Sequence, residues 1–443
     1  MSGATDPFDF TFTEWVFPQM KRFVESHVDF SGSAKRKHVA QELLGDFHGA
    51  VIKPLEIPAH ERNVVFFSER AAKAPGGLPA APEHSQIAVV GGGTMGAGIA
   101  AALRSAGLPV VLIERDDQAL ARGIDTLAKT FAGAIKRGKL TEEARDALMA
   151  GVTGATDYAA LSECDLVIEA VFEELSVKRQ VFENLITHCR RDAILATNTS
   201  YIDPREIFAG LPGAERFIGL HFFSPAQIMK LLEIVPLPET APEVLATAFA
   251  LAKQLNKIPV RAGICEGFIG NRILKRYRAE AETLVRDGVP IAQIDAAMRG
   301  YGFRMGPFEA QDLGGLDIAY LQREGARAAG QDVPETLGDM LVRAGRKGQK
   351  TGGGWYDYSQ GDRTPQPSTR VAELLAGHIA KDAPAYENAQ IAAQLIAAMA
   401  AEGEAILDEG IADKASDIDL VEIHGYGFPR WKGGPMFASG KHR

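Results

Sequence analysis

The sequence predicts an α/β domain with a parallel sheet, followed by two copies of an all-α domain. Short, continuous apolar runs alternate with helical patterns between residues 87 and 197. Strands that are buried on both faces of a parallel sheet have this composition. Beyond about residue 265 the chain becomes rich in Ala, Leu, Glu and Arg, and one pattern occurs there twice. A repeat of this kind indicates a duplicated structural unit.

The expected sheet can be followed from one apolar run to the next. Residues 87–90 (IAVV) are mostly β-branched and predict the first strand. A pattern of small residues over 94–106 predicts the helix that follows, and Gly107 ends it. Later strands are expected at residues 110–114 (VVLIE), 165–170 (DLVIEA) and 193–197 (AILAT).

The repeat in the C-terminal half pairs residues 279–288 (AEAETLVRDG) with residues 401–410 (AEGEAILDEG) without a gap. Each copy is followed by an Ile-Asp pair and then by Tyr-Gly-Phe. Two alanine-rich helices of similar composition would not share that tripeptide, so duplication is the better explanation. The pairs are Ile294-Asp295 and Ile418-Asp419, and the tripeptides begin at Tyr301 and Tyr426.

The turn between the first strand and its helix reads GGGTMG and satisfies G-x-G-x-x-G. Gly91 permits the tight turn, Gly93 lets the backbone approach a pyrophosphate, and Gly96 allows close contact between helix and strand. Glu114 ends the second strand at the expected spacing of about 20 residues. It would accept hydrogen bonds from ribose hydroxyls and repel a 2′-phosphate. A Rossmann-type NAD site is therefore predicted, and a glycine-rich turn without a ligand is the alternative.

Composition excludes several other classes of protein. The chain has 48 basic and 57 acidic side chains and a net charge of −9, whereas nucleic-acid and anionic-membrane binders carry a basic excess. No apolar run approaches the roughly 20 residues of a membrane span. The first 15 residues contain no basic side chain, so no secretory leader is expected. The three cysteines are Cys164, Cys189 and Cys265, and they form no CxxC pair. They therefore disfavour disulfides and a zinc site, and we expect no metal and a cytoplasmic location.

Several polar residues stand on or beside the predicted buried strands. Asn198 and Ser200 follow the strand at 193–197, His221 follows another apolar run, and Glu233 lies inside MKLLEIV. A carboxylate beside a histidine fixes the imidazole tautomer while the histidine takes a proton. Oxidation of a secondary alcohol by NAD requires such a base. Taken singly, His221 could be a core residue, and Asn271 in GFIGNRIL could cap a helix.

Together these motifs resemble the L-3-hydroxyacyl-CoA dehydrogenase family. The resemblance covers roughly residues 64 to 443. This part of the chain is similar to the C-terminal dehydrogenase half of the multifunctional β-oxidation enzymes, which also carry the duplicated helical domain. The motifs occur in the family's order: GGGTMGAGIA, DLVIEAVFEELSVK, ATNTS, GLHFFSPAQIMKLLEIV and GFIGNRIL, and then GPFEAQDLGGLD, GRKGQKTGGGWYDY and HGYGFPRWKGGPMF.

The resemblance implies roles for individual residues. His221 matches the catalytic histidine and Glu233 its carboxylate partner, while Ser200 and Asn271 match residues that bind the substrate's 3-oxygen and its thioester side. Ser224 stands where the family often has Asn. Any hydrogen bond that the Asn side-chain amide makes in the family is therefore in doubt here. Glu173 and Lys178 match a pair at the nicotinamide ribose. The implied cofactor-binding residues are Gly91, Gly93, Thr94, Met95, Gly96, Glu114, Glu173, Lys178 and Asn198.

The resemblance implies reversible NAD-dependent oxidation of L-3-hydroxyacyl-CoA to 3-ketoacyl-CoA. The alternatives are a dehydrogenase of a non-CoA 3-hydroxy acid and a non-catalytic NAD-binding scaffold for β-oxidation enzymes. The expected ligand partner is an acyl-CoA. A monomer is favoured, because both helical copies lie in one chain, and a homodimer is the alternative. The first 70 residues are too few for a hydratase half, so no hydratase or isomerase activity is expected.

Two stretches rich in Pro and Gly or polar residues, 71–85 and 359–368, predict linkers. The N-terminal segment is predicted to form a few helices. These could pack as a helical layer against the dehydrogenase, or they could be a docking surface for a hydratase or thiolase. Its basic run Lys35-Arg36-Lys37 is interpreted as a solvated face. The predicted fold is a Rossmann-type domain followed by two copies of the family's all-α C-terminal domain. The expected boundaries are 1–84 (helical segment and linker), 85–265 (NAD-binding domain), 266–360 (first helical copy) and 361–443 (second helical copy).

Overall fold

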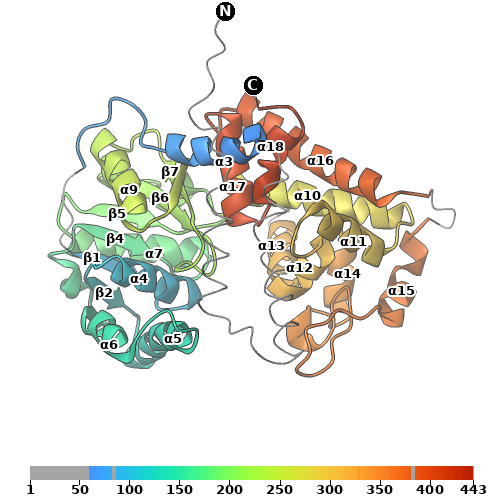
Figure 1. Cartoon of the computed structure of the whole chain (residues 1–443). Coiled ribbons are helices and arrows are strands. Elements are labelled where there is room, and N and C mark those ends of the chain that lie inside the picture. Colours follow the sequence, from blue (N-terminus) through green and yellow to red (C-terminus); the bar gives the residue numbers. More distant parts are fainter. Residues whose placement is uncertain (1–58, 82–85, 329, 381–384, 443) are drawn as a thin grey trace, which may run out of the picture. The chain divides into compact units, whose positions relative to one another are not determined.

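The computed structural model describes residues 59–81, 86–328, 330–380 and 385–442. Residues Val64–Arg443 form one compact unit, to which the features below belong apart from the first residues of helix α3. Helix α3 spans Ala59–Ala71 (Figure 1). The helices predicted before it, and the run Lys35-Arg36-Lys37, lie outside the described residues.

The described residues form one sheet in the order β3-β2-β1-β4-β5-β6-β7-β8. Strands β1 to β6 are parallel, which confirms the predicted Rossmann-type arrangement. Strand β7 is antiparallel to β6, because the short loop between them cannot hold the crossover that a parallel connection needs. The strands are Ile87–Val90 (β1), Val110–Ile113 (β2), Val152–Ala155 (β3), Leu166–Glu169 (β4), Ile194–Thr197 (β5), Phe217–Phe222 (β6), Leu231–Pro236 (β7) and Ile258–Arg261 (β8).

Helices cover both faces of this sheet. Side chains alternate along a strand, so Ile87 and Val89 join a core with α4, α5 and α9, while Ala88 and Val90 join a core with α7 and α8. This double cover explains why the strands read as continuous apolar runs. The helices are Thr94–Ser105 (α4), Asp117–Lys136 (α5), Glu142–Ala150 (α6), Leu175–His188 (α7), Pro204–Phe208 (α8) and Pro242–Gln254 (α9).

The C-terminal part is helical, as predicted (Figure 1). Its helices share one core, to which Leu231 and Val235 of β7 also contribute. Over the described ranges, none of the chain's helices combines the length and apolar character needed to cross a membrane. The helices are Gly270–Arg286 (α10), Ile291–Tyr301 (α11), Pro307–Gly314 (α12), Asp317–Ala328 (α13), Leu337–Arg343 (α14), Thr369–Leu375 (α15), Asn388–Asp408 (α16), Ala415–Gly425 (α17) and Pro435–Ala438 (α18).

The two copies of the sequence repeat make the same contact. Asp295 of α11 accepts a hydrogen bond from the Phe308 amide at the start of α12 (3.0 Å). Asp419 of α17 accepts one from the Met436 amide at the start of α18 (2.8 Å). Both aspartates are buried, and burial raises the pKa of Asp295 to about 7 and that of Asp419 to about 8. This shared capping of one helix by another supports the duplication.

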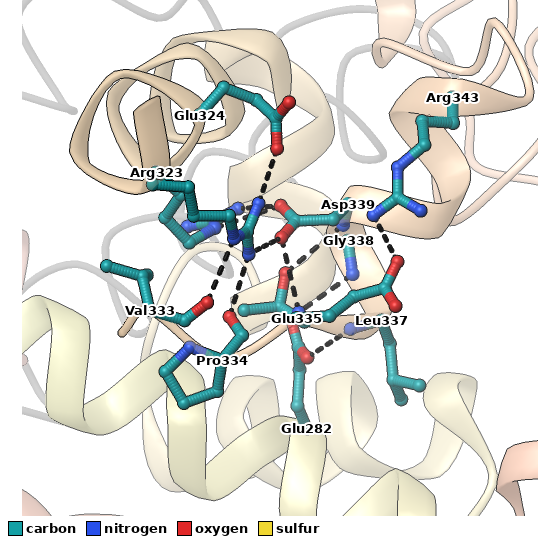
Figure 2. A network of polar contacts seen from close by, with 12 residues as sticks. Glu282, Arg323, Glu324, Val333, Pro334, Glu335, Leu337, Gly338, Asp339 and Arg343 are labelled. Carbon is teal, nitrogen blue, oxygen red and sulfur yellow. Dashed lines mark hydrogen bonds and ion pairs between the residues drawn. The ribbon is translucent and has the colours of Figure 1, made fainter. Parts of the chain in front are cut away.

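The start of α14 in the first copy is fixed by a polar network (Figure 2). Asp339 is fully buried and accepts hydrogen bonds from Arg323 Nε (2.9 Å) and Arg327 Nη2 (2.8 Å), both on α13. Glu282 of α10 accepts one from the Leu337 amide (2.7 Å). The network therefore joins three helices of this copy through charged hydrogen bonds.

The stretches predicted as linkers contain no further named helix or strand in their described parts. Residues 72–81 follow α3 directly. In the second stretch, Gln366 pairs with Asp357 in an isolated antiparallel bridge. The amide of each residue donates to the carbonyl of the other, so this segment is anchored to the first copy rather than free along its whole length.

Candidate active site

The glycine-rich turn after β1 is shaped by close packing. Gly91 has φ of +100°, and a Cβ there would lie 2.7 Å from the Ala170 carbonyl oxygen. A Cβ on Gly96 would lie 1.8 Å from the Gly91 carbonyl oxygen, whereas a Cβ on Gly93 would meet nothing within 4 Å. Gly91 and Gly96 thus make the turn tight, and Gly93 leaves the start of α4 open. Amides at the start of a helix bind phosphate in this arrangement.

A cavity of about 900 Å³ lies beside this turn. Glu114 lines it and accepts a hydrogen bond from the Gly92 amide through Oε1 (2.7 Å). Tyr158 and Arg122, which were not predicted as site residues, line it as well. An extended lining that joins the glycine turn to Glu114 suits a dinucleotide. Of the predicted cofactor-binding residues, those that line the cavity are Gly91, Gly93, Thr94, Met95, Glu114 and Glu173.

Lys178 pairs with Glu173, and the ribose contact predicted for these two residues stays a prediction. Its side chain is fully buried, with Nζ 2.8 Å from Glu169 Oε1 and 3.3 Å from Glu173 Oε2. Its ammonium group thus holds the carboxylates of Glu169 and Glu173 together. Glu169 was not among the predicted site residues, although a glutamate that ends an apolar run such as LVIE is typical of a buried, paired charge.

Glu173 fixes the loop that follows β5. Its Oε1 accepts hydrogen bonds from the amides of Ser200 (2.8 Å) and Tyr201 (3.0 Å), and from the Thr199 hydroxyl (2.6 Å). Burial alone would raise the pKa of Glu173, but Lys178 and these hydrogen bonds outweigh burial and lower the pKa below its ordinary value. Glu173 therefore stays ionised, and it links the cavity to Ser200.

Three of the predicted catalytic residues form a chain of hydrogen bonds. Ser200 Oγ lies 3.1 Å from His221 Nε2, and His221 Nδ1 lies 2.6 Å from Glu233 Oε2. His221 is 4% exposed and Glu233 is 0% exposed. The second oxygen of Glu233 accepts hydrogen bonds from the amides of Ile269 (3.2 Å) and Gly270 (3.1 Å). Every buried atom of this carboxylate is thus satisfied, as a buried charge requires.

The two candidate asparagines are fixed in different ways. Asn198 Oδ1 accepts a hydrogen bond from the Phe222 amide (2.9 Å), so Asn198 holds the end of β6 next to His221. Asn271, in the first turn of α10, accepts a hydrogen bond at Oδ1 from the hydroxyl of Tyr426 (2.8 Å). The exposed Ser224 lies in the loop between β6 and β7. Tyr426 was not among the predicted site residues, although it lies in the repeated Tyr-Gly-Phe.

Two of the three cysteines, Cys164 and Cys189, lie in the core beneath the sheet. Cys164 and Cys189 are buried free thiols, and burial raises their pKa to about 12 and about 11. A thiol with a raised pKa is a poor nucleophile at neutral pH. In the described ranges, no group of three or more His, Cys, Asp or Glu side chains is arranged to hold a metal ion.

Comparison with known proteins identifies both domains. Residues 86–265 match the family model of the 3-hydroxyacyl-CoA dehydrogenase NAD binding domain, and residues 267–358 match that of its C-terminal domain. The peroxisomal bifunctional enzyme of Cavia porcellus is 35% identical over 430 residues, which are 88% of this chain and 58% of that protein. A peroxisomal multifunctional β-oxidation protein of Oryza sativa is 37% identical over 384 residues, covering 84% of this chain and 53% of that protein. The chain spans about half the length of these curated relatives.

Solved structures show the same relationship. The 3-hydroxybutyryl-CoA dehydrogenase of Escherichia coli K12 has a TM-score of 0.69 and 29% identity, covering 81% of this chain and 92% of that one. The (S)-3-hydroxybutyryl-CoA dehydrogenase of Ralstonia eutropha has a TM-score of 0.58 and 34% identity. The match covers 62% of this chain and all of that one.

The predicted cytoplasmic location is wrong by this comparison, because the relatives are named peroxisomal or glyoxysomal enzymes. The prediction depended on unpaired cysteines, which report on thiol oxidation and do not distinguish one reducing compartment from another.

The domain matches identify an oxidoreductase whose cofactor is NAD. The glycine turn fits this cofactor, because the space at Gly93 is open and Gly91 and Gly96 leave no room for side chains. The chain belongs to the 3-hydroxyacyl-CoA dehydrogenase family.

Proposed function

We propose that the chain catalyses the reversible, NAD-dependent oxidation of L-3-hydroxyacyl-CoA to 3-ketoacyl-CoA. The observation that carries this proposal is the hydrogen-bonded chain Ser200–His221–Glu233, which Glu173 links to the predicted dinucleotide cavity. A buried histidine that is hydrogen-bonded to a carboxylate side chain is a competent general base. The matches to both family domains support the same reaction.

The roles of the residues follow from their hydrogen bonds. Bound NAD⁺ supplies a hydride acceptor for C3 of the substrate. His221 accepts the proton of the 3-hydroxyl group at Nε2, while Glu233 keeps the remaining proton on Nδ1 and stabilises the imidazolium. Ser200 lies within hydrogen-bonding distance of the same Nε2, so its hydroxyl is placed to bind the 3-oxygen. Asn271 would donate from its amide to the developing carbonyl or the thioester.

In the reverse direction, protonated His221 donates its proton to the ketone. Reduction consumes one proton from solution, so the equilibrium shifts toward the hydroxyacyl-CoA as the pH falls. Glu114 would bind the adenosine ribose hydroxyls, because it lines the cavity and its carboxylate lies at the glycine turn.

The experiment that tests the proposal compares two substrates with NADH: acetoacetyl-CoA and free acetoacetate. We expect NADH oxidation with acetoacetyl-CoA and a kcat/KM at least about 100-fold lower with acetoacetate, because the CoA moiety adds binding energy. Equal rates would indicate a dehydrogenase of non-CoA acids. NADH binding without turnover of either substrate would indicate a scaffold and would overturn the proposal.

A further inference from the structure

We propose that Tyr426, on the second helical copy, is a positioning residue for Asn271 on the first, so that the second copy completes the active site. This inference depends on the proposed function, since it assigns Tyr426 a part in that reaction. The two residues are 155 positions apart in the sequence, and Tyr426 follows α17 directly.

The hydrogen bond between them determines which way the Asn271 amide faces. Tyr426 Oη donates to Asn271 Oδ1 at 2.8 Å, which places the carbonyl side of the amide toward the tyrosine. The amide nitrogen then points away from Tyr426. Within the described residues the Asn271 side chain has no other hydrogen-bond partner, so its N–H groups remain available to a ligand. An asparagine held in this way is a prepared donor for a carbonyl oxygen.

The tyrosine ring is held against the backbone that carries the site. A Cβ added to Gly270 would lie 2.3 Å from Tyr426 Cε2, so only glycine leaves room for the ring. The Gly270 amide donates to Glu233 (3.1 Å). The start of α10 therefore lies between Tyr426 and the carboxylate that orients the catalytic histidine.

A second contact fixes the same ring from the side of the sheet. The rings of Tyr426 and Phe223 meet edge to face with centroids 5.6 Å apart, and Phe223 lies 4.5 Å from the His221 ring. Rings held on two sides lose little further freedom when a substrate binds. Burial, followed by the nearby charge of Glu233, raises the pKa of Tyr426 well above its ordinary value. The hydroxyl thus stays protonated and acts as a donor at working pH.

The first copy supplies an internal comparison. Tyr301 is at the equivalent sequence position of the first copy, and its ring contacts Phe303 and Phe428 (centroids 6.2 and 6.0 Å apart). The two equivalent tyrosines therefore have different neighbours, since one contacts Asn271 and the other belongs to an aromatic cluster. Tyr301 is the matched control, because Tyr301→Phe removes one hydroxyl from the same motif.

The test is Tyr426→Phe, which keeps the ring and removes only the donor. We expect kcat for the reduction of acetoacetyl-CoA to fall about tenfold, which corresponds to the loss of one hydrogen bond acting in the transition state. The Kd for NADH and the thermal midpoint should stay near the wild-type values. Tyr301→Phe should keep the wild-type kcat.

A double-mutant cycle separates positioning from general support of the fold. In an Asn271→Ala background, Tyr426→Phe should lower kcat less than twofold further, because its effect passes through the missing amide. An unchanged kcat in Tyr426→Phe, or a full tenfold effect in the Asn271→Ala background, would overturn the inference and leave the proposed function standing. A wild-type chain that binds NADH but does not reduce acetoacetyl-CoA would overturn both.

Discussion

His221 and Glu233 stand directly opposite each other in the antiparallel pair of β6 and β7, and 2.6 Å separates Nδ1 from Oε2. Opposite residues in such a pair share a face of the sheet, so the strand register itself aligns the base with its carboxylate. The start of α10 then holds the other oxygen of Glu233 through two amides. One hairpin and one helix terminus therefore hold the carboxylate that orients the imidazole.

Replacing Glu233 by glutamine should separate the charge of this residue from its shape. Glu233→Gln keeps the side-chain volume but removes the negative charge that stabilises the imidazolium. We expect kcat for acetoacetyl-CoA reduction to fall about 100-fold. The Kd for NADH should not change, because Glu233 does not line the cavity. A kcat within threefold of the wild type would show that the carboxylate charge is not needed.

The two glycines of the dinucleotide turn should respond differently to alanine. Gly96→Ala places a Cβ 1.8 Å from a backbone oxygen, and we expect it to lower the free energy of unfolding by about 1–3 kcal/mol. Gly93→Ala meets no protein atom within 4 Å, so the fold should keep its stability while the Kd for NADH rises about tenfold. Urea denaturation and NADH fluorescence titration measure the two effects. A loss of stability in Gly93→Ala with no such loss in Gly96→Ala would contradict this prediction.

Asp339 should stabilise the first helical copy in a pH-dependent way (Figure 2). Burial would raise its pKa, but the hydrogen bonds of Arg323 and Arg327 outweigh burial and lower the pKa below its ordinary value. A carboxylate with a lowered folded-state pKa stabilises above its unfolded pKa of about 4 and loses this effect as the pH falls further. Asp339→Asn should therefore lower the free energy of unfolding by about 3 kcal/mol at pH 7.

The same substitution should have less effect under acidic conditions. The difference between Asp339→Asn and wild type should shrink as the pH is lowered from 5 to 3, measured by urea denaturation at each pH. Glu324→Gln is the control, because Glu324 is an exposed partner of Arg327 and should change stability by less than about 1 kcal/mol. A pH-independent difference for Asp339→Asn would show that packing, rather than charge, explains the loss.

Features that depend on neighbouring residues in the chain were predictable from the sequence. The glycine turn, the apolar strands and the duplicated helices each leave a local pattern, and the family resemblance placed His221 and Glu233. Strand β3 was missed because its sequence, VTGA, is short, small and partly exposed at the sheet edge. The reversal of β7 was missed because an apolar run does not indicate direction.

Contacts between distant segments were not predictable. The resemblance paired Lys178 with Glu173, but only tertiary packing brings the second partner, Glu169, to its ammonium group. Tyr426 lies in a motif that the repeat singled out, yet its contact with Asn271 depends on how the second copy packs on the first. Such pairs are set by tertiary structure, which local patterns do not report.

The most direct test of the proposed reaction is the turnover of His221→Gln. NADH binding is measured by fluorescence titration, and acetoacetyl-CoA reduction is followed by loss of NADH absorbance. Because His221 supplies the proton and does not line the dinucleotide cavity, we expect a Kd within twofold of wild type and a kcat about 1,000-fold lower. Near-wild-type turnover in His221→Gln would contradict the assignment of His221 as the catalytic acid and base.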